Sequence, residues 1–169
     1  MSSCINNFEA VGYQCLQLQD FSTLEHFTCG IPRMDQDIHN PNLRQEIEEN
    51  HYVAYGVYDE QKHLLAFFAV GQDKYEDPGF AFEIAYLAVR KDLQYQGIGK
   101  ACIRRINQMA IEKGYKILTV SALSITKPES EKYEAVSFYR RCGFKQYEPQ
   151  DKNMDIVPMW KRIEPLDEK

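Results

Sequence analysis

The sequence lacks any apolar stretch that approaches the ~20 residues needed to cross a lipid bilayer. Its start, Met1 to Asn7, also lacks the basic residues and the following apolar run that mark a secretory leader. Neither a membrane-spanning helix nor an export signal is therefore predicted. We expect a cytoplasmic protein without a membrane partner.

Cysteine is present, but in no arrangement that suits a disulfide framework or a metal site. The five cysteines are widely spaced and form no CxxC pair, and the four histidines are equally dispersed. We therefore predict reduced thiols that pack in the core or lie at the surface, and no bound metal. The cysteines are Cys4, Cys15, Cys29, Cys102 and Cys142.

The chain has no excess of positive charge, since its formal net charge is −5 at pH 7. Binding along a nucleic acid requires clustered lysine and arginine side chains that neutralise phosphates. The candidates are three basic pairs, at residues 104–105, 140–141 and 161–162. This balance argues against a broad nucleic-acid surface but leaves room for a small basic patch.

The composition and patterning that are present are those of one ordinary globular domain. Of the 169 residues, 44% are hydrophobic and 27% charged, and the chain contains no repeat. Strands are predicted at residues 11–18, 51–58, 63–72, 82–89, 117–122, 144–147 and 157–163, helices at 97–113 and 131–142, and helix mixed with loop at 20–50. This order predicts a single α/β domain over residues 1–169, with a mixed sheet and helices on both faces.

In the most informative segment, a buried strand runs into a loop with two glycines that opens directly into a helix. The strand ends at Val89, and the glycines are Gly97 and Gly99. Such a loop exposes several backbone N–H groups, and the helix start adds roughly half a positive charge. Glycine also lets a phosphate approach the backbone without a Cβ in the way. The segment predicts an anion site that suits a pyrophosphate, although an ordinary strand-to-helix turn has the same pattern.

Two other phosphate-binding patterns are absent. The chain contains no GxxxxGK[ST], the loop that holds a nucleoside triphosphate. It also contains no GxGxxG followed by an acidic residue at the offset of a ribose-binding carboxylate. A P-loop enzyme and a Rossmann dinucleotide-binding unit are therefore not predicted.

Two motifs in the chain, Gln94-x-x-Gly97-x-Gly99 and AVSFYRRCGF at residues 135–144, resemble those of the GNAT superfamily, the general-control-related N-acetyltransferases. Gln94-x-x-Gly97-x-Gly99 resembles the family's (Gln/Arg)-x-x-Gly-x-(Gly/Ala) acyl-CoA signature. Further along, residues 135–144, of sequence AVSFYRRCGF, resemble the family's second element, A-x-x-(Leu/Phe)-Tyr-x-x-x-Gly-Phe. The resemblance covers residues 53–163. It implies an acetyl-CoA-dependent N-acetyltransferase of the GNAT fold, a mixed, mostly antiparallel sheet of six to seven strands with a central splayed parallel pair and about four flanking helices.

The resemblance also assigns roles in binding acetyl-CoA, the co-substrate. Main-chain groups at the strand end would bind the pantetheine arm and polarise the thioester carbonyl, and the glycine loop would hold the pyrophosphate, mostly through N–H groups. In the family this strand carries a bulge that splays it from the next strand, here residues 117–122, and opens a cleft. The strand-end residues are Leu87, Ala88 and Val89, and the loop residues are Gln94, Gln96, Gly97, Ile98, Gly99 and Lys100.

Tyr139 stands where many family members carry the tyrosine that protonates the leaving coenzyme A thiolate. A phenol of pKa ~10 is a reasonable acid toward a thiolate whose conjugate acid has a similar pKa, and the alternative is a core aromatic. Glu83 lies on the strand where some relatives carry the base that takes a proton from the amine. Its alternative role is a solvated carboxylate, and Tyr86 and His51 are weaker options for the base.

The chain departs from the family at one cofactor contact. Many relatives carry an asparagine three residues before the alanine that opens the second motif, and Lys132 stands there in this chain. A side-chain contact to the cofactor at this position is therefore in doubt. The preceding loop, residues 124–132, is long and charged, and is a candidate wall for the acceptor side.

The sequence leaves several acceptors open. Residues 27–35, of sequence FTCGIPRMD, and residues 157–163 resemble a branch that includes toxins of toxin–antitoxin pairs, which acetylate aminoacyl-tRNA. Both segments are alternatively structural, and the negative net charge counts against gripping tRNA. We predict a primary amine of a small molecule, an amino acid or a peptide, with aminoacyl-tRNA and a non-catalytic acyl-CoA sensor as alternatives. A homodimer is compatible with the resemblance, and neither the oligomeric state nor an antitoxin partner follows from the sequence.

Overall fold

The computed structural model describes residues 8–94, 96–123, 135–147 and 156–163. The chain forms two compact units, each built from two separate stretches of sequence. The N-terminal unit combines residues 8–71 with 85–105, and the C-terminal unit combines residues 72–84 with 106–163. Within the described ranges, no helix is both long and apolar enough to cross a membrane.

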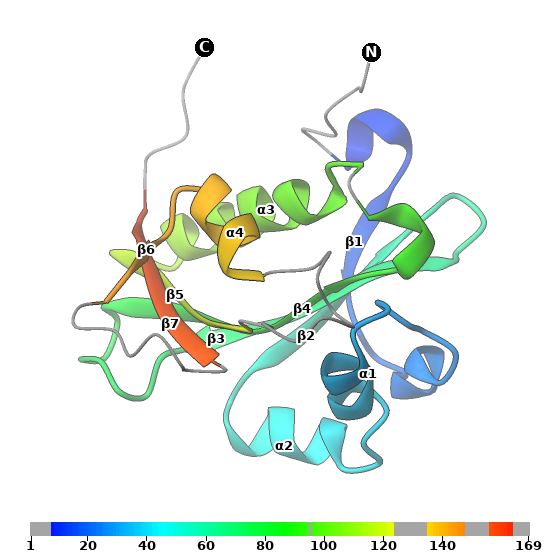
Figure 1. Cartoon of the computed structure of the whole chain (residues 1–169), viewed down its shortest axis with the longest axis horizontal. Helices are drawn as coiled ribbons and strands as arrows, with labels where there is room; N and C mark the ends of the chain where they lie inside the picture. The colour runs from blue at the N-terminus through cyan, green and yellow to red at the C-terminus, as the bar shows by residue number, and fades with distance from the viewer. Residues whose placement is uncertain (1–7, 95, 124–134, 148–155, 164–169) are drawn as a thin grey trace. The chain divides into compact units, whose positions relative to one another are not determined.

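Seven strands form one sheet in the order β1-β2-β3-β4-β5-β7-β6. β4 and β5 run parallel, whereas the pairs β1–β2, β2–β3, β5–β7 and β6–β7 are antiparallel. The strands are β1 (Gln14–Gln17), β2 (Val53–Tyr58), β3 (Leu64–Gln72), β4 (Ala81–Val89), β5 (Ile117–Leu123), β6 (Lys145–Gln146) and β7 (Ile156–Arg162). The α-helices of the described residues, labelled in Figure 1, are α1 (Pro32–Ile38), α2 (Leu43–Glu49), α3 (Ile98–Glu112) and α4 (Ala135–Arg141). The predicted mixed sheet with one parallel pair is confirmed.

In the N-terminal unit, the two strands predicted at residues 51–58 and 63–72 are β2 and β3, which pair antiparallel as a hairpin. The polar turn closes because the Asp59 N–H donates to the His63 carbonyl at 3.1 Å. Lys62 adopts a φ of 67° in this turn, a left-handed conformation that reverses the chain within a few residues. Residues 65–71 of β3 are all buried, as expected of an apolar strand that is covered on both faces.

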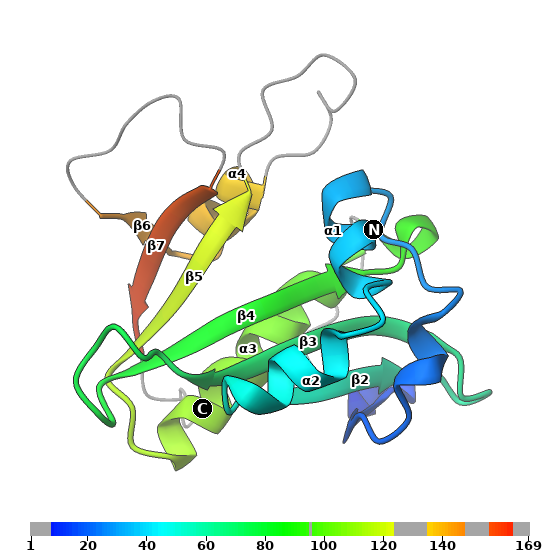
Figure 2. The ribbon, with the colours of Figure 1, turned by 90° about the horizontal axis from the view of Figure 1, so that it is seen from below.

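Two short helices of the N-terminal unit follow one another before β2. α1 begins at Pro32, whose fixed φ suits the first position of a helix. The helices bury Ile38, Leu43 and Ile47, each no more than 3% exposed. α2 contacts β2, as Figure 2 also shows.

In the C-terminal unit, β5 lies between β4 and β7 (Figure 2), and its side chains alternate between two faces. Leu118 is fully buried and pairs with Lys161 of β7, so both side chains lie on one face. Lys161 Nζ donates to the Cys142 carbonyl at 2.9 Å, directly after α4. This face of the sheet therefore carries α4, and Ile117 and Thr119 point to the opposite face.

The N-terminal strand is shorter than the predicted 11–18. A 3-10 turn covers Glu9–Val11, and Gly12 has a φ of 78° and donates its N–H to the Glu9 carbonyl. This left-handed residue ends the extended backbone, because glycine alone adopts that conformation freely. β1 therefore starts at Gln14, and Val11 is 44% exposed instead of facing the core.

A glycine follows each of the two helices, close to the ends predicted at residues 113 and 142. Gly114 follows α3 with a φ of 82°, and Gly143 follows α4 with a φ of 96°, the left-handed conformation of a helix C-terminus. Cys142 lies just after α4 rather than inside it. The predicted helix residues 131–134, the loop 124–132 and Lys132 lie outside the described residues.

Candidate active site

The connection from β4 to α3 in the N-terminal unit is fixed by backbone hydrogen bonds at its start. The Arg90 N–H donates to the Leu65 carbonyl, and the Lys91 N–H donates to the Thr28 carbonyl, both at 2.8 Å. A single 3-10 turn, Lys91–Leu93, then leads to Gln94. The loop therefore leaves β4 in a direction set by two neighbouring segments of the chain.

The side chain of Gln94 holds this loop against another one. Its Nε2 donates to the Cys29 carbonyl at 2.5 Å and to the Val89 carbonyl at 3.2 Å. The sequence predicted that Gln94 contacts the pyrophosphate, mostly by N–H groups. The amide nitrogen of its side chain joins the end of β4 to the Cys29 turn, a positioning role that the motif does not indicate, and the predicted contact of its N–H group with the pyrophosphate stays a prediction.

Gln94→Ala should lower the free energy of unfolding by about 1–2 kcal/mol, because it removes two hydrogen bonds of ~0.5–1.5 kcal/mol each. Urea denaturation measures the change. Gln96→Ala is the matched control, since the Gln96 side chain is exposed and such changes stay within ~0.5 kcal/mol. Equal values for the two variants would contradict the positioning role.

Gly97 forms the start of α3. Its φ of 91° lies in the left-handed region, which glycine adopts without the steric cost that other residues bear. Its carbonyl accepts the Ala101 N–H at 3.0 Å, the first bond of the helix. The following N–H groups, including those of Ile98 and Gly99, have no earlier carbonyl within the helix to donate to. This geometry is compatible with the anion site that the sequence predicts, and the role of these residues stays a prediction.

The predicted loop residues differ in exposure. Ile98 is only 1% exposed and anchors the helix start in the core. Gln96 and Lys100 are exposed, and Gly97 and Gly99 are partly exposed. The backbone at the helix start therefore reaches solvent while a buried isoleucine keeps it in place. At the end of β4, Leu87 and Ala88 are buried and Val89 is half-buried.

The Cys29 turn is organised around the carboxylate of Asp35, in the first turn of α1. Asp35 accepts hydrogen bonds from the Thr28 hydroxyl at 2.5 Å, the Cys29 N–H at 2.8 Å and the Cys29 thiol at 3.2 Å. Burial opposes ionisation of Asp35, but these bonds together lower its pKa below the ordinary value of 3.8. Burial first, with the carboxylate nearby, raises the pKa of Cys29 to about 12. Cys29 is therefore a protonated structural thiol at neutral pH.

Asp35→Asn should lower the free energy of unfolding at pH 7, and the difference from the wild type should become smaller in acid. A carboxyl whose pKa is lowered by folding stabilises the native state above its unfolded pKa of ~3.9, and this stabilisation is lost as the pH falls through the native pKa. Denaturant unfolding between pH 7 and pH 3 measures it. Asp37→Asn, on the exposed side of α1, is the control. A loss of unfolding free energy in Asp35→Asn that does not change with pH would contradict the role of the Asp35 charge.

The two predicted catalytic residues belong to the C-terminal unit. Glu83 is half-buried on β4 and pairs with Thr119 of β5. Tyr139 of α4 is 6% exposed. Its ring meets Phe138 and Phe144 edge-on, with centroids 5.1 and 5.3 Å away. The aromatic contacts fix the ring of Tyr139, so its hydroxyl has a defined position.

The weaker options for the base lie in the N-terminal unit. Tyr86 packs against Phe67 with ring centroids 6.2 Å apart. Burial, followed by the charges of Glu46 and Asp37, raises the pKa of Tyr86, which disfavours the phenolate that a base requires. His51 is exposed at the end of α2. Neither residue gains support as a base from these positions.

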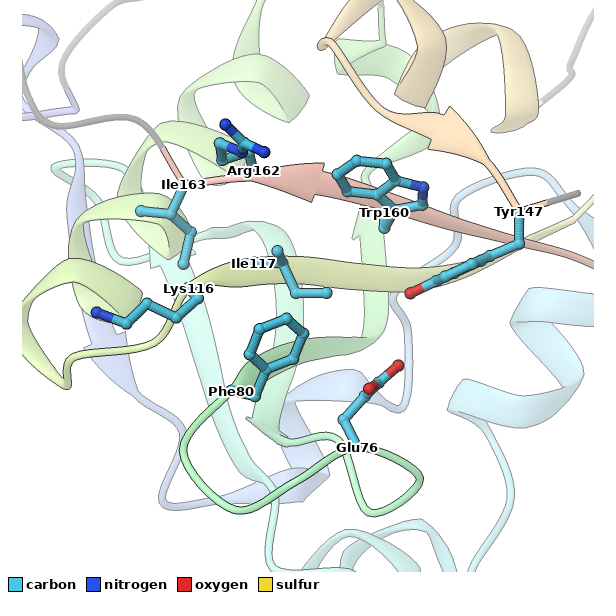
Figure 3. A pocket seen from close by; sticks show the side chains of 8 residues that line it. All are labelled: Glu76, Phe80, Lys116, Ile117, Tyr147, Trp160, Arg162 and Ile163. Atoms are coloured by element: carbon cyan, nitrogen blue, oxygen red, sulfur yellow. The ribbon is translucent and has the colours of Figure 1, made fainter.

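A pocket of about 580 Å³ in the C-terminal unit (Figure 3) was not predicted from the sequence. It lies on the face of β5 and β7 opposite α4 and is lined by aromatic, aliphatic and charged side chains. The alternation of β7, with Met159 fully buried and Trp160 half-buried, is the signal that could have indicated a large aromatic on the uncovered face. Across the described residues, no group of three or more histidine, cysteine or acidic side chains could hold a metal ion.

Comparison with known proteins extends these observations. The family model of the acetyltransferase (GNAT) domain matches residues 48–146, and no curated protein matches the sequence. Similar solved structures include an aminoglycoside 6'-N-acetyltransferase complexed with coenzyme A, at 14% identity and a TM-score of 0.66, with 90% of this chain and 98% of that one covered. A bacterial toxin matches at 17% identity and a TM-score of 0.63, with 89% and 90% covered. A tyrosine-to-phenylalanine mutant of the toxin AtaT, bound to the C-terminus of the antitoxin AtaR and acetyl-CoA, matches at 17% identity and a TM-score of 0.62, with 90% and 94% covered.

At these identities the similar structures establish the fold. Two of them hold coenzyme A or acetyl-CoA, in agreement with acetyl-CoA as the co-substrate of the family and with the co-substrate predicted here. The family model itself spans more than half of the chain and includes β4, the Gly97 loop, α3 and α4. The chain therefore belongs to the GNAT family of acetyltransferases.

Proposed function

We propose that this protein transfers an acetyl group from acetyl-CoA to a primary amine of a small molecule, an amino acid or a peptide. The observation that carries the proposal is the start of α3, where Gly97 adopts a φ of 91° directly after the β4 connection. A left-handed glycine followed by N–H groups that have no acceptor within the helix suits a pyrophosphate. Family membership supplies the acetyl donor that carries such a group.

The chain's residues divide the binding of acetyl-CoA between strand and helix. The N–H groups of Gln94 and of residues 96–100 would hold the pyrophosphate, with the Lys100 ammonium adding positive charge. Main-chain groups from Leu87 to Val89 would bind the pantetheine arm. The parallel register joins Ala81–Ile84 to Ile117–Val120.

The proposed reaction is a direct transfer. The amine nitrogen attacks the thioester carbon, the bond from carbon to sulfur breaks, and the acetyl group becomes an amide. Glu83 takes the proton that the amine loses, and Tyr139 donates a proton to the coenzyme A thiolate. A main-chain N–H near Leu87 would stabilise the carbonyl oxygen as its negative charge grows, a contribution of ~3–4 kcal/mol in other enzymes.

Release of free thiol from acetyl-CoA tests the proposal. The assay uses two acceptor sets, a panel of small amines and peptides and a pool of charged tRNA. Turnover on at least one small amine or peptide is expected. Each acetylated product is then identified by mass spectrometry, so that transfer is separated from simple hydrolysis of the thioester.

Other outcomes would overturn parts of the proposal. Turnover on charged tRNA alone would make aminoacyl-tRNA the acceptor and would overrule the inference from net charge. Tight binding of coenzyme A without turnover on either set would support an acyl-CoA sensor. Failure to bind acetyl-CoA would contradict the role of the Gly97 loop.

A further inference from the structure

The pocket of the C-terminal unit lies on one face of the sheet. Ile117 pairs with Arg162, and Thr119 pairs with Trp160. Paired residues of neighbouring strands project to the same face, so these four side chains share the face opposite α4. Ile117, Trp160 and Arg162 all line the pocket.

The two ends of the pocket carry opposite charge, as Figure 3 shows. Lys116 and Arg162 lie at one end, and Glu76 lies with Tyr147 at the other. None of these three charged side chains forms an ion pair with another described residue. Their charges are therefore available to a ligand.

The acidic end has a second carboxylate. Burial, and then the charges of Glu76 and Asp73, raise the pKa of Tyr147. Both carboxylates thus lie close to the phenol, which stays protonated at neutral pH. The Lys145 ammonium already lies 5.9 Å from the centre of the Trp160 ring, so the carboxylates and not that ring would hold a cationic ligand group.

The floor between the two ends is apolar. It consists of Phe80, Ile117 and Ile163 together with the ring of Trp160. The Trp160 and Tyr147 rings lie 6.4 Å apart, and Phe80 is 41% exposed. An apolar ligand body would cover this surface.

The acidic end is adjacent to the candidate base. Glu83 pairs with Thr119, whose hydroxyl donates to Asp73 at 2.8 Å. Thr119 in turn pairs with Trp160. An amine at the acidic end would therefore lie on the same face as Glu83 and one strand away from it.

We propose that this pocket binds the acceptor and that the acceptor is a zwitterion with an apolar body. This inference rests on the proposed acetyl transfer. The amine lies toward Glu83 and the acidic end, and a carboxylate lies at Lys116 and Arg162. The pair Ile117–Arg162 lies two residues along the strands from the pair Thr119–Trp160, a separation of about 7 Å. An extended dipeptide spans about the same length. A short peptide with apolar side chains fits this pattern.

Leucyl-leucine, its C-terminal amide and its N-acetyl form test the proposal. Isothermal titration calorimetry without cofactor measures the binding of all three, and thiol release measures KM and kcat for the first two. The variants are the double change Lys116→Gln with Arg162→Gln, the single change Glu76→Gln, and the conservative Arg162→Lys. Lys113→Gln is the matched control, because Lys113 is exposed, lies three residues before Lys116 and does not line the pocket.

The wild type should prefer the free carboxylate over the amide by about tenfold, and the double variant should lose this preference by raising KM for the free dipeptide alone. Glu76→Gln should raise KM for both the dipeptide and its amide about threefold, and Arg162→Lys should retain most of the preference. Each variant is first checked for an unchanged thermal unfolding midpoint, and Arg162→Lys keeps the test valid if the double variant fails to fold.

Equal binding of dipeptide and amide by the wild type would overturn the proposal. A preference that survives in the double variant would do the same. If the dipeptide binds with the carboxylate preference but acetyl-CoA is not consumed, the pocket stands as a ligand site and the acetyl transfer fails. If other amines are acetylated and the dipeptide does not bind, the proposed transfer stands and the zwitterion pocket fails.

Discussion

Gly97→Asp should abolish measurable binding of acetyl-CoA while the protein stays folded. Gly97 has a φ of 91° at the first residue before α3, where N–H groups and the helix dipole favour an anion. An aspartate there places a negative charge and a side chain where the pyrophosphate would lie. We expect affinity to fall by more than about 100-fold, equivalent to more than ~2.7 kcal/mol.

Titration calorimetry with coenzyme A measures this loss, and Gly114→Asp is its matched control. Gly114 lies just past the other end of α3 with a φ of 82°, and a Cβ there meets nothing within 4 Å. Both variants therefore carry the same new residue and a similar backbone strain of ~1–2 kcal/mol. Retained tight binding in Gly97→Asp, or equal loss in Gly114→Asp, would mean that the loop does not hold the cofactor.

Elements with strong local signals were predictable from the sequence. The apolar positions of α3, among them Ile98, Cys102 and Ile106, recur at helical spacing and are all buried. Gly114 and Gly143 mark helix ends because their left-handed φ cannot be replaced cheaply by another residue. The hairpin of β2 and β3 was also predictable, since a polar turn separates two apolar runs.

Features that depend on long-range contacts were not predictable in the same way. Gln94 matches a cofactor motif, yet its amide nitrogen contacts the Cys29 carbonyl, which lies 65 residues earlier in the chain. Nothing near Gln94 in the sequence indicates that partner. The strand predicted at residues 11–18 was too long for a local reason. The left-handed Gly12 interrupts an alternation that otherwise resembles a strand.

The pocket required the register of the sheet as well as the sequence. Trp160, Thr119 and Glu83 are far apart in sequence and become neighbours only through the pairing of β4, β5 and β7. Asp73 reaches the same face through its bond with the Thr119 hydroxyl. Alternation along one strand predicts which of its side chains share a face. The order and register of the strands decide which side chains of different strands become neighbours on that face.

Tyr139→Phe should lower kcat by about 10²- to 10⁴-fold, the range ascribed to a positioned acid, with acetyl-CoA affinity largely kept. The change removes only the hydroxyl, so the edge-on ring contacts with Phe138 and Phe144 persist. Because Tyr139 is buried at 6% exposure, water cannot readily take the place of its hydroxyl as the proton donor. Steady-state thiol release gives kcat, and calorimetry with acetyl-CoA gives the affinity separately.

A matched control and a leaving-group comparison separate acid catalysis from a packing role. Tyr115→Phe removes a phenol hydroxyl from the ring stacked on Phe82, at 4.9 Å, and should leave kcat unchanged. An acetyl donor whose thiol is a stronger acid needs less help from a proton donor, so it should recover part of the rate of Tyr139→Phe but not speed the wild type equally. An unchanged kcat in Tyr139→Phe would leave Tyr139 as a core aromatic and would assign protonation of the thiolate to another group.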